Sequence, residues 1–240
     1  MLIAVPSKGR AGNTTTQNVV ASGIFFVPES EMDDYNRSGV KAVIPVPNDI
    51  RGITRTRNWI LKNQNDKRVV FLDDDCQRIG WAEMLDENVQ HHHLPESVVL
   101  VEFTKLFEIT EALHYRIWGA STISASRAVY PQKPFLFRTY VVASCMGVVN
   151  TGIRFDESYQ VKEDYELCLR CIVEDGGIVG ARYFYCESAH WTIGGGCAEY
   201  RTQEMEADAI ARLIKTYPGL IRQVKRGGSQ FSVALDFPGS

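Results

Sequence analysis

The chain has 240 residues, of which 45% are hydrophobic and 23% are charged, and its formal net charge is −3. These values are typical of a globular protein and exclude collagen, coiled-coil and intrinsically disordered classes. They also argue against a dedicated nucleic-acid coat protein, although a local basic groove is compatible with them. Residues 1–70 hold ten Lys and Arg against six Asp and Glu, which suits an anionic ligand; scattered surface charge is an equally open alternative.

Short apolar runs alternate with polar, helix-like segments over the first 75 residues. The apolar runs lie at 2–5, 24–28, 42–46 and 69–72, and the predicted helices lie near 13–21, from about 30, and near 53–64. This alternation predicts a βαβαβαβ unit with a parallel sheet. Ligands collect at the carboxyl ends of the strands in such sheets. A Ser-Lys-Gly-Arg loop follows the first of these strands, and three aspartates follow the fourth.

The rest of the chain gives less regular signals. Residues 97–103 fit either a strand or the start of a helix. The further predicted helices cover 104–114, 162–174 and 200–216, and the further predicted strands lie within 118–126, 140–149 and 178–186. No repeat, low-complexity tract or linker interrupts this order, so the chain is predicted to form one domain.

The six cysteines fall mostly inside apolar runs. Cys168 and Cys171 form a CxxC pair, but they lie in a helical stripe and no second pair stands at zinc-site spacing. We therefore expect reduced core thiols, as in a cytosolic protein. The first residues lack the basic segment of a signal peptide, and no apolar run approaches the length of a membrane span. The sequence thus predicts a cytoplasmic protein without membrane association.

The strongest local signal is the run VVFLDDD. A hydrophobic strand that ends in Asp73, Asp74 and Asp75 brings like charges together, and these stay ionised only if a cation or basic partners neutralise them. Oxygen ligands favour Mg²⁺ or Mn²⁺, which usually also coordinate substrate phosphates. A solvated turn is the alternative. A phosphatase of the haloacid dehalogenase type fits less well, because this strand is the fourth and Gln77 stands where that pattern has Thr or Val.

A second candidate motif is the acidic start of the helix predicted over 162–174. Apolar residues between 165 and 173 recur at the spacing of an amphipathic helix, so Glu163 and Asp164 fall in its first turn. Asp164 is predicted to border the buried stripe, whereas Glu163 points further away, which makes Asp164 the better-placed general base. The alternative is that both carboxylates only complement the helix dipole.

Two further segments carry candidate binding residues. His190 follows an apolar strand and precedes three glycines, so its loop could close over a phosphate with backbone N–H groups; a structural histidine is the alternative. The basic side chains that could face a diphosphate are Lys8, Arg10, Arg51, Arg55 and Arg57. The segment PSKGRAG, which carries Lys8 and Arg10, lacks the spacing of an ATP-binding P-loop. The three histidines at 91–93 are predicted to lie in a surface loop.

Taken in order, these motifs resemble those of GT-A glycosyltransferases. TRTRNWILKNQNDKRVVFLDDD resembles the family-2 pattern of an ARN helix, a strand and DxD, and FDESYQVKEDYELCLR resembles its later FDE and ED segment. The combination of IAVPSKGRAGNT, RGITRTRNWIL and FLDDD most resembles the TET-associated glycosyltransferases of phages and some eukaryotic proteins. The resemblance implies a single α/β GT-A domain over 1–240, with a mostly parallel central sheet flanked by helices. Its expected parts are a nucleotide-binding half (1–75), an acceptor and catalytic half (76–198), and a C-terminal helix and tail (199–240).

The resemblance also implies a role for each matching residue of the metal site. Asp73 and Asp75 would hold the ribose and a divalent metal, Mn²⁺ or Mg²⁺, and His190 would complete the metal shell. Because this run has three aspartates, Asp74 is an alternative ligand of the ribose.

The remaining roles concern the reaction and its two substrates. Asp164 would take the proton from the acceptor hydroxyl, and Glu163 would orient the acceptor or the sugar. The residues expected to bind the nucleotide sugar are Pro6, Ser7, Lys8, Arg10, Arg55, Arg57 and Asp74. Those expected to contact the acceptor are Arg127, Tyr130 and Trp191.

The reaction implied by the resemblance is an inverting transfer from a UDP-sugar to the hydroxyl of 5-hydroxymethylcytosine in DNA. Phage members are thought to perform it, which would place this enzyme in the cytoplasm of a bacteriophage host. A protein or small-molecule hydroxyl is an alternative acceptor. A metal-dependent phosphatase or nucleotidyltransferase, and a non-enzymatic module that binds a nucleotide sugar or DNA, are alternatives of other classes.

Overall fold

The computed structural model describes residues 1–85, 88–121, 132–189, 201–226 and 229–237. The helices longer than one turn are α1 (Met32–Arg37), α2 (Ile53–Asn63), α3 (Glu96–Ala112), α4 (Glu163–Asp175) and α5 (Gln203–Thr216). The strands are β1 (Leu2–Pro6), β2 (Ile24–Pro28), β3 (Val43–Val46), β4 (Arg68–Leu72), β5 (Cys76–Leu85), β6 (Asn88–His93), β7 (Ile117–Ser121), β8 (Phe135–Leu136), β9 (Cys145–Val149), β10 (Val179–Ser188), β11 (Ile221–Arg226) and β12 (Ser229–Leu235).

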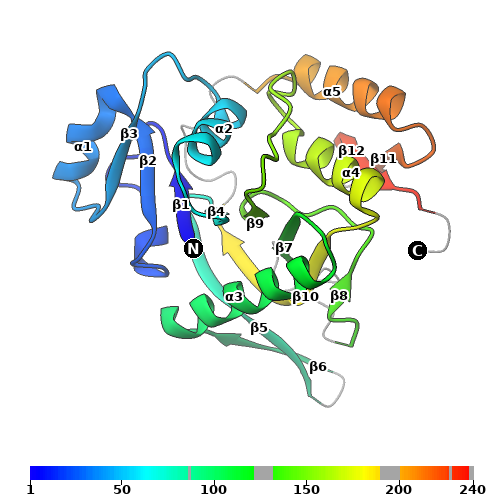
Figure 1. Ribbon diagram of the computed structural model, residues 1–240, viewed down its shortest axis with the longest axis horizontal. Helices are drawn as coiled ribbons and strands as arrows, with labels where there is room; N and C mark the ends of the chain where they lie inside the picture. Colours follow the sequence, from blue (N-terminus) through cyan, green and yellow to red (C-terminus); the bar gives the residue numbers. More distant parts are fainter. Residues whose placement is uncertain (86–87, 122–131, 190–200, 227–228, 238–240) are drawn as a thin grey trace.

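One twisted sheet runs through the molecule in the order β3-β2-β1-β4-β9-β7-β10-β5-β6, with β8 paired to β10 (Figure 1). The first four strands in this order are mutually parallel, as the alternation over residues 1–75 predicts. Strand β9 is antiparallel to its neighbours β4 and β7, and β5 is antiparallel to its neighbours β10 and β6. Within this order, β9 and β5 therefore run in the direction opposite to the other strands. The predicted α/β class with a mostly parallel central sheet is confirmed.

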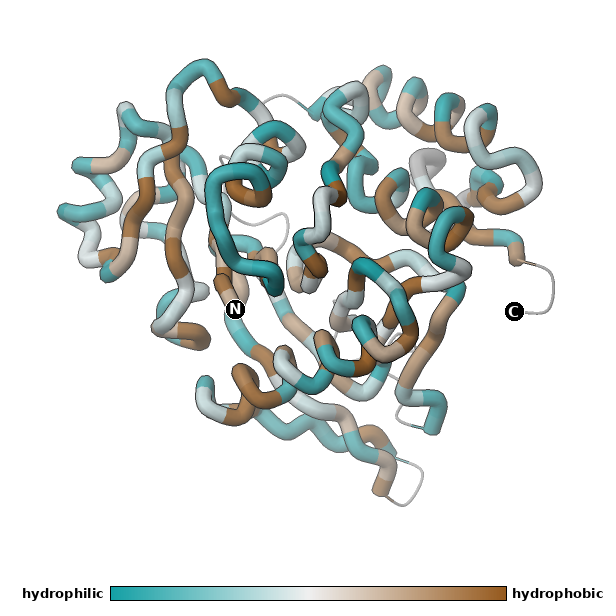
Figure 2. Tube along the Cα trace, viewed as in Figure 1, coloured by the Kyte–Doolittle hydropathy of each residue, from teal (hydrophilic) through white to brown (hydrophobic). Residues whose placement is uncertain are grey.

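Alternating side chains of the strands divide the apolar interior into two cores. Leu2 and Ala4 of β1 face the core that holds the buried sides of α2, α4 and α5 and the β11–β12 pair. Ile3 and Val5 face the opposite core, which is covered by α1 and α3. In Figure 2 the hydrophobic colour accordingly follows the central strands, while the outer turns are hydrophilic. Helices therefore flank both faces of the sheet, and the ends of the parallel strands stay available for polar residues.

Several local predictions were wrong, each for a tertiary reason. The helix predicted near 13–21 is only a 3-10 turn at Thr16–Asn18, whose first residue is buried against the turn after β4. For residues 97–103, where a strand and a helix start were both open, the structure has the helix α3. The histidines at 91–93 lie on the edge strand β6 instead of in a loop, because β5 supplies a pairing partner. The tail after α5 forms the β11–β12 hairpin.

The thiol prediction is confirmed for the cysteines that the structure describes, which are all buried and free. Cys76 and Cys186 lie close together beneath the turn after β4, with 3.3 Å between their sulfur atoms. Cys197 lies outside the described residues. None of the helices in the described part of the chain combines the length and the apolar character that crossing a bilayer requires.

Candidate active site

The turn that carries the three aspartates is fixed by its backbone. The hydroxyl of Thr16 donates to the carbonyl oxygen of Asp73 at 2.6 Å and accepts from the N–H of Cys76 at 3.0 Å. The N–H of Thr15 donates to the carbonyl of Asp74 at 3.0 Å, and the N–H of Asp73 donates to the carbonyl of Ser144 at 3.1 Å. Residues before β2 and residues before β9 therefore both hydrogen-bond to the turn between β4 and β5. These bonds fix the backbone from which the three carboxylates project.

Asp74 is bound by the loop that follows β1. Its carboxylate accepts hydrogen bonds from the hydroxyl of Ser7 and from the guanidinium of Arg10, the latter at 2.6 Å. Burial raises the pKa of Asp74, and these two partners oppose that shift. The hydroxyl of Tyr35 lies 2.6 Å from that of Ser7, and burial raises the pKa of Tyr35 to about 12. Asp74 thus ties the turn after β4 to the loop after β1.

Asp75 is the third aspartate of the turn, and one of its carboxylate oxygens accepts no hydrogen bond from the described residues. Its side chain is buried, and its Oδ2 lies 3.6 Å from a guanidinium nitrogen of Arg10. Its Oδ1 is also buried and has no hydrogen-bond partner among the described residues. The N–H of Ala189 donates to the carbonyl of Asp75 at 3.1 Å, so the chain reaches this turn one residue before His190, which itself lies outside the described residues.

Arg57 of α2 links the aspartate turn to the start of α4. Its Nη1 lies 2.6 Å from Oε1 of Glu163, and its Nη2 lies 3.8 Å from Oδ1 of Asp73. The guanidinium is only 4% exposed and lies 5.8 Å and 5.6 Å from the ring centres of Phe71 and Phe155. Such stacking suits the weakly hydrated guanidinium group, which remains charged in an apolar setting. Asp73 and Glu163, one from each carboxylate motif, therefore lie beside the same guanidinium group.

The burial prediction for the acidic pair was wrong. Glu163 is buried and Asp164 is partly exposed, because Arg57 approaches from α2 and holds the Glu163 carboxylate inside. Burial and the neighbouring Asp164 carboxylate raise the pKa of Glu163 to about 7, against the opposing charge of Arg57. Burial also raises the pKa of Asp164, against the charges of Arg57 and Lys162. One Asp164 oxygen accepts the N–H of Tyr165 at 2.9 Å.

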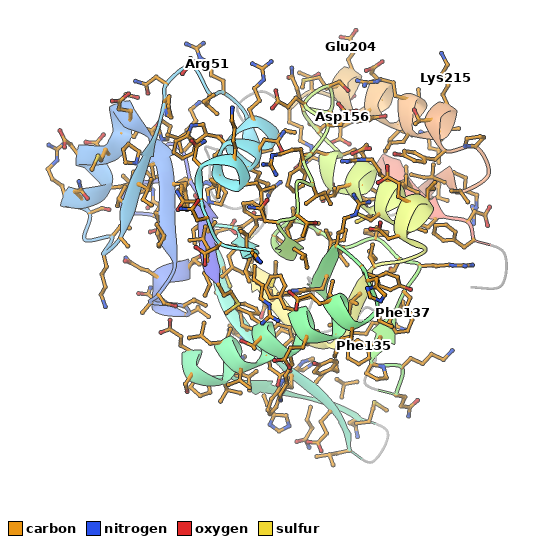
Figure 3. The ribbon with its side chains drawn as sticks, in the orientation of Figure 1. Arg51, Phe135, Phe137, Asp156, Glu204 and Lys215 are labelled. Atoms are coloured by element: carbon orange, nitrogen blue, oxygen red, sulfur yellow. The ribbon has the colours of Figure 1, made fainter. Side chains whose placement is uncertain are left out.

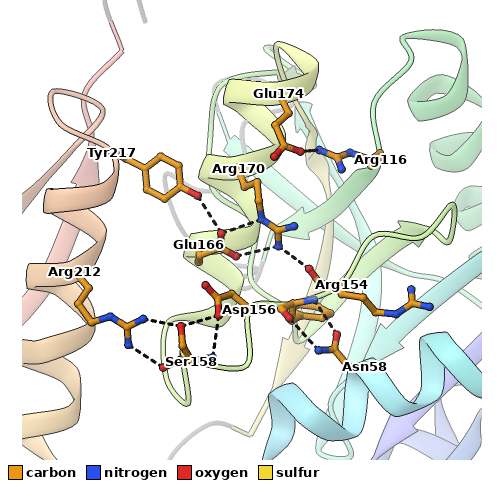
Figure 4. A network of polar contacts seen from close by, with 11 residues as sticks. Asn58, Arg116, Arg154, Asp156, Ser158, Glu166, Arg170, Glu174, Arg212 and Tyr217 are labelled. Carbon is orange, nitrogen blue, oxygen red and sulfur yellow. Dashed lines mark hydrogen bonds and ion pairs between the residues drawn. The ribbon is translucent and has the colours of Figure 1, made fainter.

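The loop before α4, which carries the FDE sequence, is fastened to three helices. The side-chain amide of Asn58 on α2 donates to the carbonyl of Phe155 at 2.9 Å. Arg170 of α4 donates to the carbonyl of Arg154 at 2.6 Å, and Arg212 of α5 donates to the hydroxyl of Ser158 at 2.6 Å (Figure 4). This loop therefore sets where α4 begins.

The remaining predicted residues fall into three groups. Pro6 ends β1 and is partly buried, while Lys8 is exposed in the next loop. Arg55 is exposed and lies 3.5 Å from Glu157, and Figure 3 shows Arg51 at the outer edge of the molecule. The predicted residues outside the described part of the chain are Arg127, Tyr130, His190 and Trp191.

Sequence reasoning missed Glu31, which stands beside the loop after β1. Its carboxylate accepts the N–H of Gly9 at 2.6 Å. The two residues line a surface recess of about 570 Å³ together with Ala11, Asp34, Arg37 and Ser38. The only signal in the sequence is that Glu31 follows the end of β2, the next parallel strand, where ligand-binding residues gather.

The donor chemistry of the aspartate turn fits a hard divalent cation. Carboxylate oxygens are preferred ligands of Mg²⁺ and Mn²⁺, and the buried Oδ1 of Asp75, which has no hydrogen-bond partner in the described part of the chain, is an acceptor of this kind. The described residues contain no group of three His, Cys, Asp or Glu side chains that could hold a metal ion by themselves. A complete shell would need a further ligand.

Comparison with solved structures identifies the fold. Glucosyl-3-phosphoglycerate synthase from Mycobacterium tuberculosis, solved with Mg²⁺ and UDP, matches with a TM-score of 0.52 at 13% identity, covering 92% of this chain and 83% of that one. The mannosyltransferase PcManGT from Pyrobaculum calidifontis, solved with GDP-Man and Mn²⁺, matches with a TM-score of 0.52 at 11% identity, covering 88% and 60%. These proteins are GT-A glycosyltransferases, and the chain shares their fold.

Staphylococcus aureus TarS 1-349 has a lower TM-score of 0.43 at 12% identity, covering 78% of this chain; this chain spans 60% of that structure. No curated protein sequence matches the chain. The model of the TET-associated glycosyltransferase family matches residues 1–195, which is most of the chain and includes both carboxylate motifs. The chain therefore belongs to the TET-associated glycosyltransferase family.

Proposed function

We propose that this protein transfers a sugar from a UDP-sugar to the hydroxyl of 5-hydroxymethylcytosine in DNA, with inversion at the anomeric carbon. Family membership supports sugar transfer, and two structural neighbours of the same fold are complexes with UDP and with GDP-Man. The observation that carries the proposal is the Arg57 bridge, which puts the aspartate turn and the Glu163–Asp164 pair into one site. A transferase needs a site for the nucleotide diphosphate and a base for the acceptor, and both must lie close to the bond between sugar and diphosphate that breaks.

The donor would lie against the aspartate turn and the loop after β1. Asp73 is the aspartate proposed to meet the ribose, because Asp74 is already bound by Ser7 and Arg10. Asp75 and His190 are proposed to hold a divalent metal, Mn²⁺ or Mg²⁺. When bound, this metal would neutralise charge on the departing diphosphate. The nucleoside would rest on Pro6 to Arg10, beside the recess lined by Gly9 and Glu31.

The transfer step is proposed to be a single displacement. The acceptor oxygen forms a bond to the anomeric carbon while the bond from that carbon to the diphosphate oxygen breaks, and UDP leaves with the electron pair. The carboxylate of Asp164 takes the acceptor proton, and a positioned base of this kind contributes about 10²–10⁴-fold. Glu163 is held by Arg57 and would orient the acceptor or sugar beside it.

The DNA acceptor is proposed from the family, whose name links it to TET enzymes. A modified cytosine inside a duplex would have to be flipped out or presented on a single strand to meet Asp164. Contacts to the DNA are proposed for Arg127, Tyr130 and Trp191. Binding through phosphates would make the rate fall steeply with salt, because displaced counterions oppose association.

The test is a mass-spectrometric assay of digested nucleosides. The protein is incubated with Mn²⁺, a panel of UDP-sugars and DNA that contains either 5-hydroxymethylcytosine or cytosine. A hexose or N-acetylhexosamine added only to the hydroxymethylated base would establish donor class and acceptor together. UDP-sugar hydrolysis without transfer would retain the donor site and reject the DNA acceptor. Release of inorganic phosphate without any sugar product would favour the phosphatase alternative.

A further inference from the structure

Lys162 occupies an unusual backbone conformation next to the acidic pair. It is the N-cap of α4, with φ 61° and ψ 20°, and it directly precedes Glu163. The left-handed region is unfavourable for a residue with a side chain, so the surroundings must stabilise Lys162 there. The conformation of Lys162 also decides the direction in which the first turn of α4 leaves, and hence where both carboxylates stand.

The group that holds Lys162 comes from α5. The Lys162 Nζ lies 3.2 Å from Oε2 of Glu206 and 5.0 Å from the ring centre of Tyr165. Both members of this ion pair are shielded, with side-chain exposures of 11% for Lys162 and 8% for Glu206. Arg201 pairs with the other oxygen of the same carboxylate. Since solvent and salt screen a shielded pair little, the attraction between the two charges ties the Lys162 ammonium group to the position of Glu206.

The helix that carries Glu206 is itself fixed against α4. Figure 1 shows α5 alongside α4, and the hydroxyl of Tyr217 after α5 donates to Glu166 at 3.0 Å (Figure 4). Ala209, Ile210 and Leu213 of α5 are buried in the core shared with α4. The family model ends at residue 195, so α5 and its carboxylate lie beyond the matched segment.

We propose that Glu206 is a positioning residue for the acidic pair. Through the ammonium group of Lys162, it keeps the left-handed turn in place and thereby fixes where Glu163 and Asp164 stand. The catalytic part of this inference rests on the proposed sugar transfer, whereas its structural part does not. It assigns a role in the site to the C-terminal segment outside the family match.

The test compares Glu206→Gln with Asp208→Asn in the full chain. Both changes remove one carboxylate from α5, but Asp208 is exposed and makes only a 4.0 Å contact with Arg212. Hydrogen exchange of a peptide that covers the first turn of α4 needs no catalytic activity. We expect exchange there to be about tenfold faster in Glu206→Gln and unchanged in Asp208→Asn. In the transfer assay, kcat should fall about 10- to 100-fold in Glu206→Gln, with the KM for the UDP-sugar within about twofold.

A second pair of variants covers the case in which Glu206→Gln fails to fold because Lys162 is left unpaired. Lys162→Gly removes that charge and adopts the left-handed turn without strain. If Glu206 acts through Lys162, adding Glu206→Gln to Lys162→Gly should change neither exchange nor kcat by more than about twofold. A tenfold further change in this background would overturn the inference.

The outcomes separate the two proposals. Wild-type exchange and wild-type kcat in Glu206→Gln would overturn the positioning role while sugar transfer stands. Faster exchange in Glu206→Gln, with no transfer by any form including wild type, would support the positioning role and reject the proposed function. Equal effects of Glu206→Gln and Asp208→Asn would also overturn the inference, because the change would then come from charge on α5 in general.

Discussion

Arg57 and Glu163 are 106 positions apart in the chain, yet the guanidinium Nη1 lies 2.6 Å from the carboxylate Oε1. The same guanidinium is within 3.8 Å of Asp73. Its position couples the aspartate turn to the start of α4, because neither carboxylate motif keeps its electrostatic surroundings without the arginine. Four predictions follow from this arrangement and from the proposed chemistry.

Replacement of Arg57 by Ala should be strongly destabilising. The change leaves the buried Glu163 without its partner, and breaking a buried pair on one side costs about 3–5 kcal/mol. Urea unfolding measures this loss, and the double variant Arg57→Ala/Glu163→Gln should lose clearly less than the sum of the single changes. Arg55→Ala is the matched control, because the Arg55 side chain is 56% exposed, and the unfolding free energy of this variant should stay within about 0.5 kcal/mol of wild type. Additive effects in the double variant would contradict the bridge.

Asp164→Asn should abolish turnover and keep the donor site. We expect kcat to fall about 10²–10⁴-fold, because an amide cannot take the acceptor proton. Isothermal titration with UDP and Mn²⁺ should give the wild-type affinity, since Asp164 is not part of the aspartate turn. Turnover near the wild-type rate would move the base to another residue.

Removal of the metal should weaken donor binding in a manner that depends on Asp75. In wild type, EDTA is expected to reduce the affinity for UDP, because the diphosphate charge is then no longer neutralised. Asp75→Ala should bind UDP weakly with or without Mn²⁺, while Asp49→Ala, a change at an exposed loop residue, should behave as wild type. Calorimetric titration of the three proteins with and without Mn²⁺ checks this. A full Mn²⁺ response in Asp75→Ala would exclude Asp75 as a ligand.

The rate should depend on pH through the acidic pair. Burial raises the pKa of Asp164 above its ordinary 3.8, so kcat/KM should fall as the pH drops through a value above 3.8 and the base becomes protonated. Glu163 lies beside Asp164 and its pKa is also raised, so the apparent pKa values in a pH–rate profile belong to the pair of carboxylates. In Glu163→Gln the neighbouring negative charge is gone, so the acid limb should move to lower pH. A shift of this limb to higher pH in the pH–rate profile would contradict the assignment.

The parallel strands of the first 75 residues could be predicted from sequence because their signals are local. Each of these four strands is a short apolar run, and the three aspartates directly follow the last of them. The β5–β6 hairpin could not be predicted in this way, because its polar outer strand is defined by pairing with β5 and not by its own composition. The C-terminal hairpin was likewise missed.

The same division applies within the site. Asp73, Asp75, Glu163 and Asp164 could be named as candidates because each belongs to a motif in a short stretch of sequence. The burial of Glu163 could not be predicted. Helical periodicity indicates which face of a helix is apolar, but it does not reveal that Arg57 of α2 pairs with Glu163. Glu206 gave no signal either, because its importance comes from a lysine 44 positions earlier.

The hydroxyl of Thr16, which both donates to the turn after β4 and accepts from it, has a consequence for the kinetics of ligand binding. Thr16 is fully buried, and these contacts are present in the structure without any ligand. A cation or nucleotide that arrives at the turn meets a backbone already in its final shape, and little conformational entropy is lost on association. Binding should therefore proceed at a rate set by diffusion and by loss of bound water, without a slow search among loop conformations.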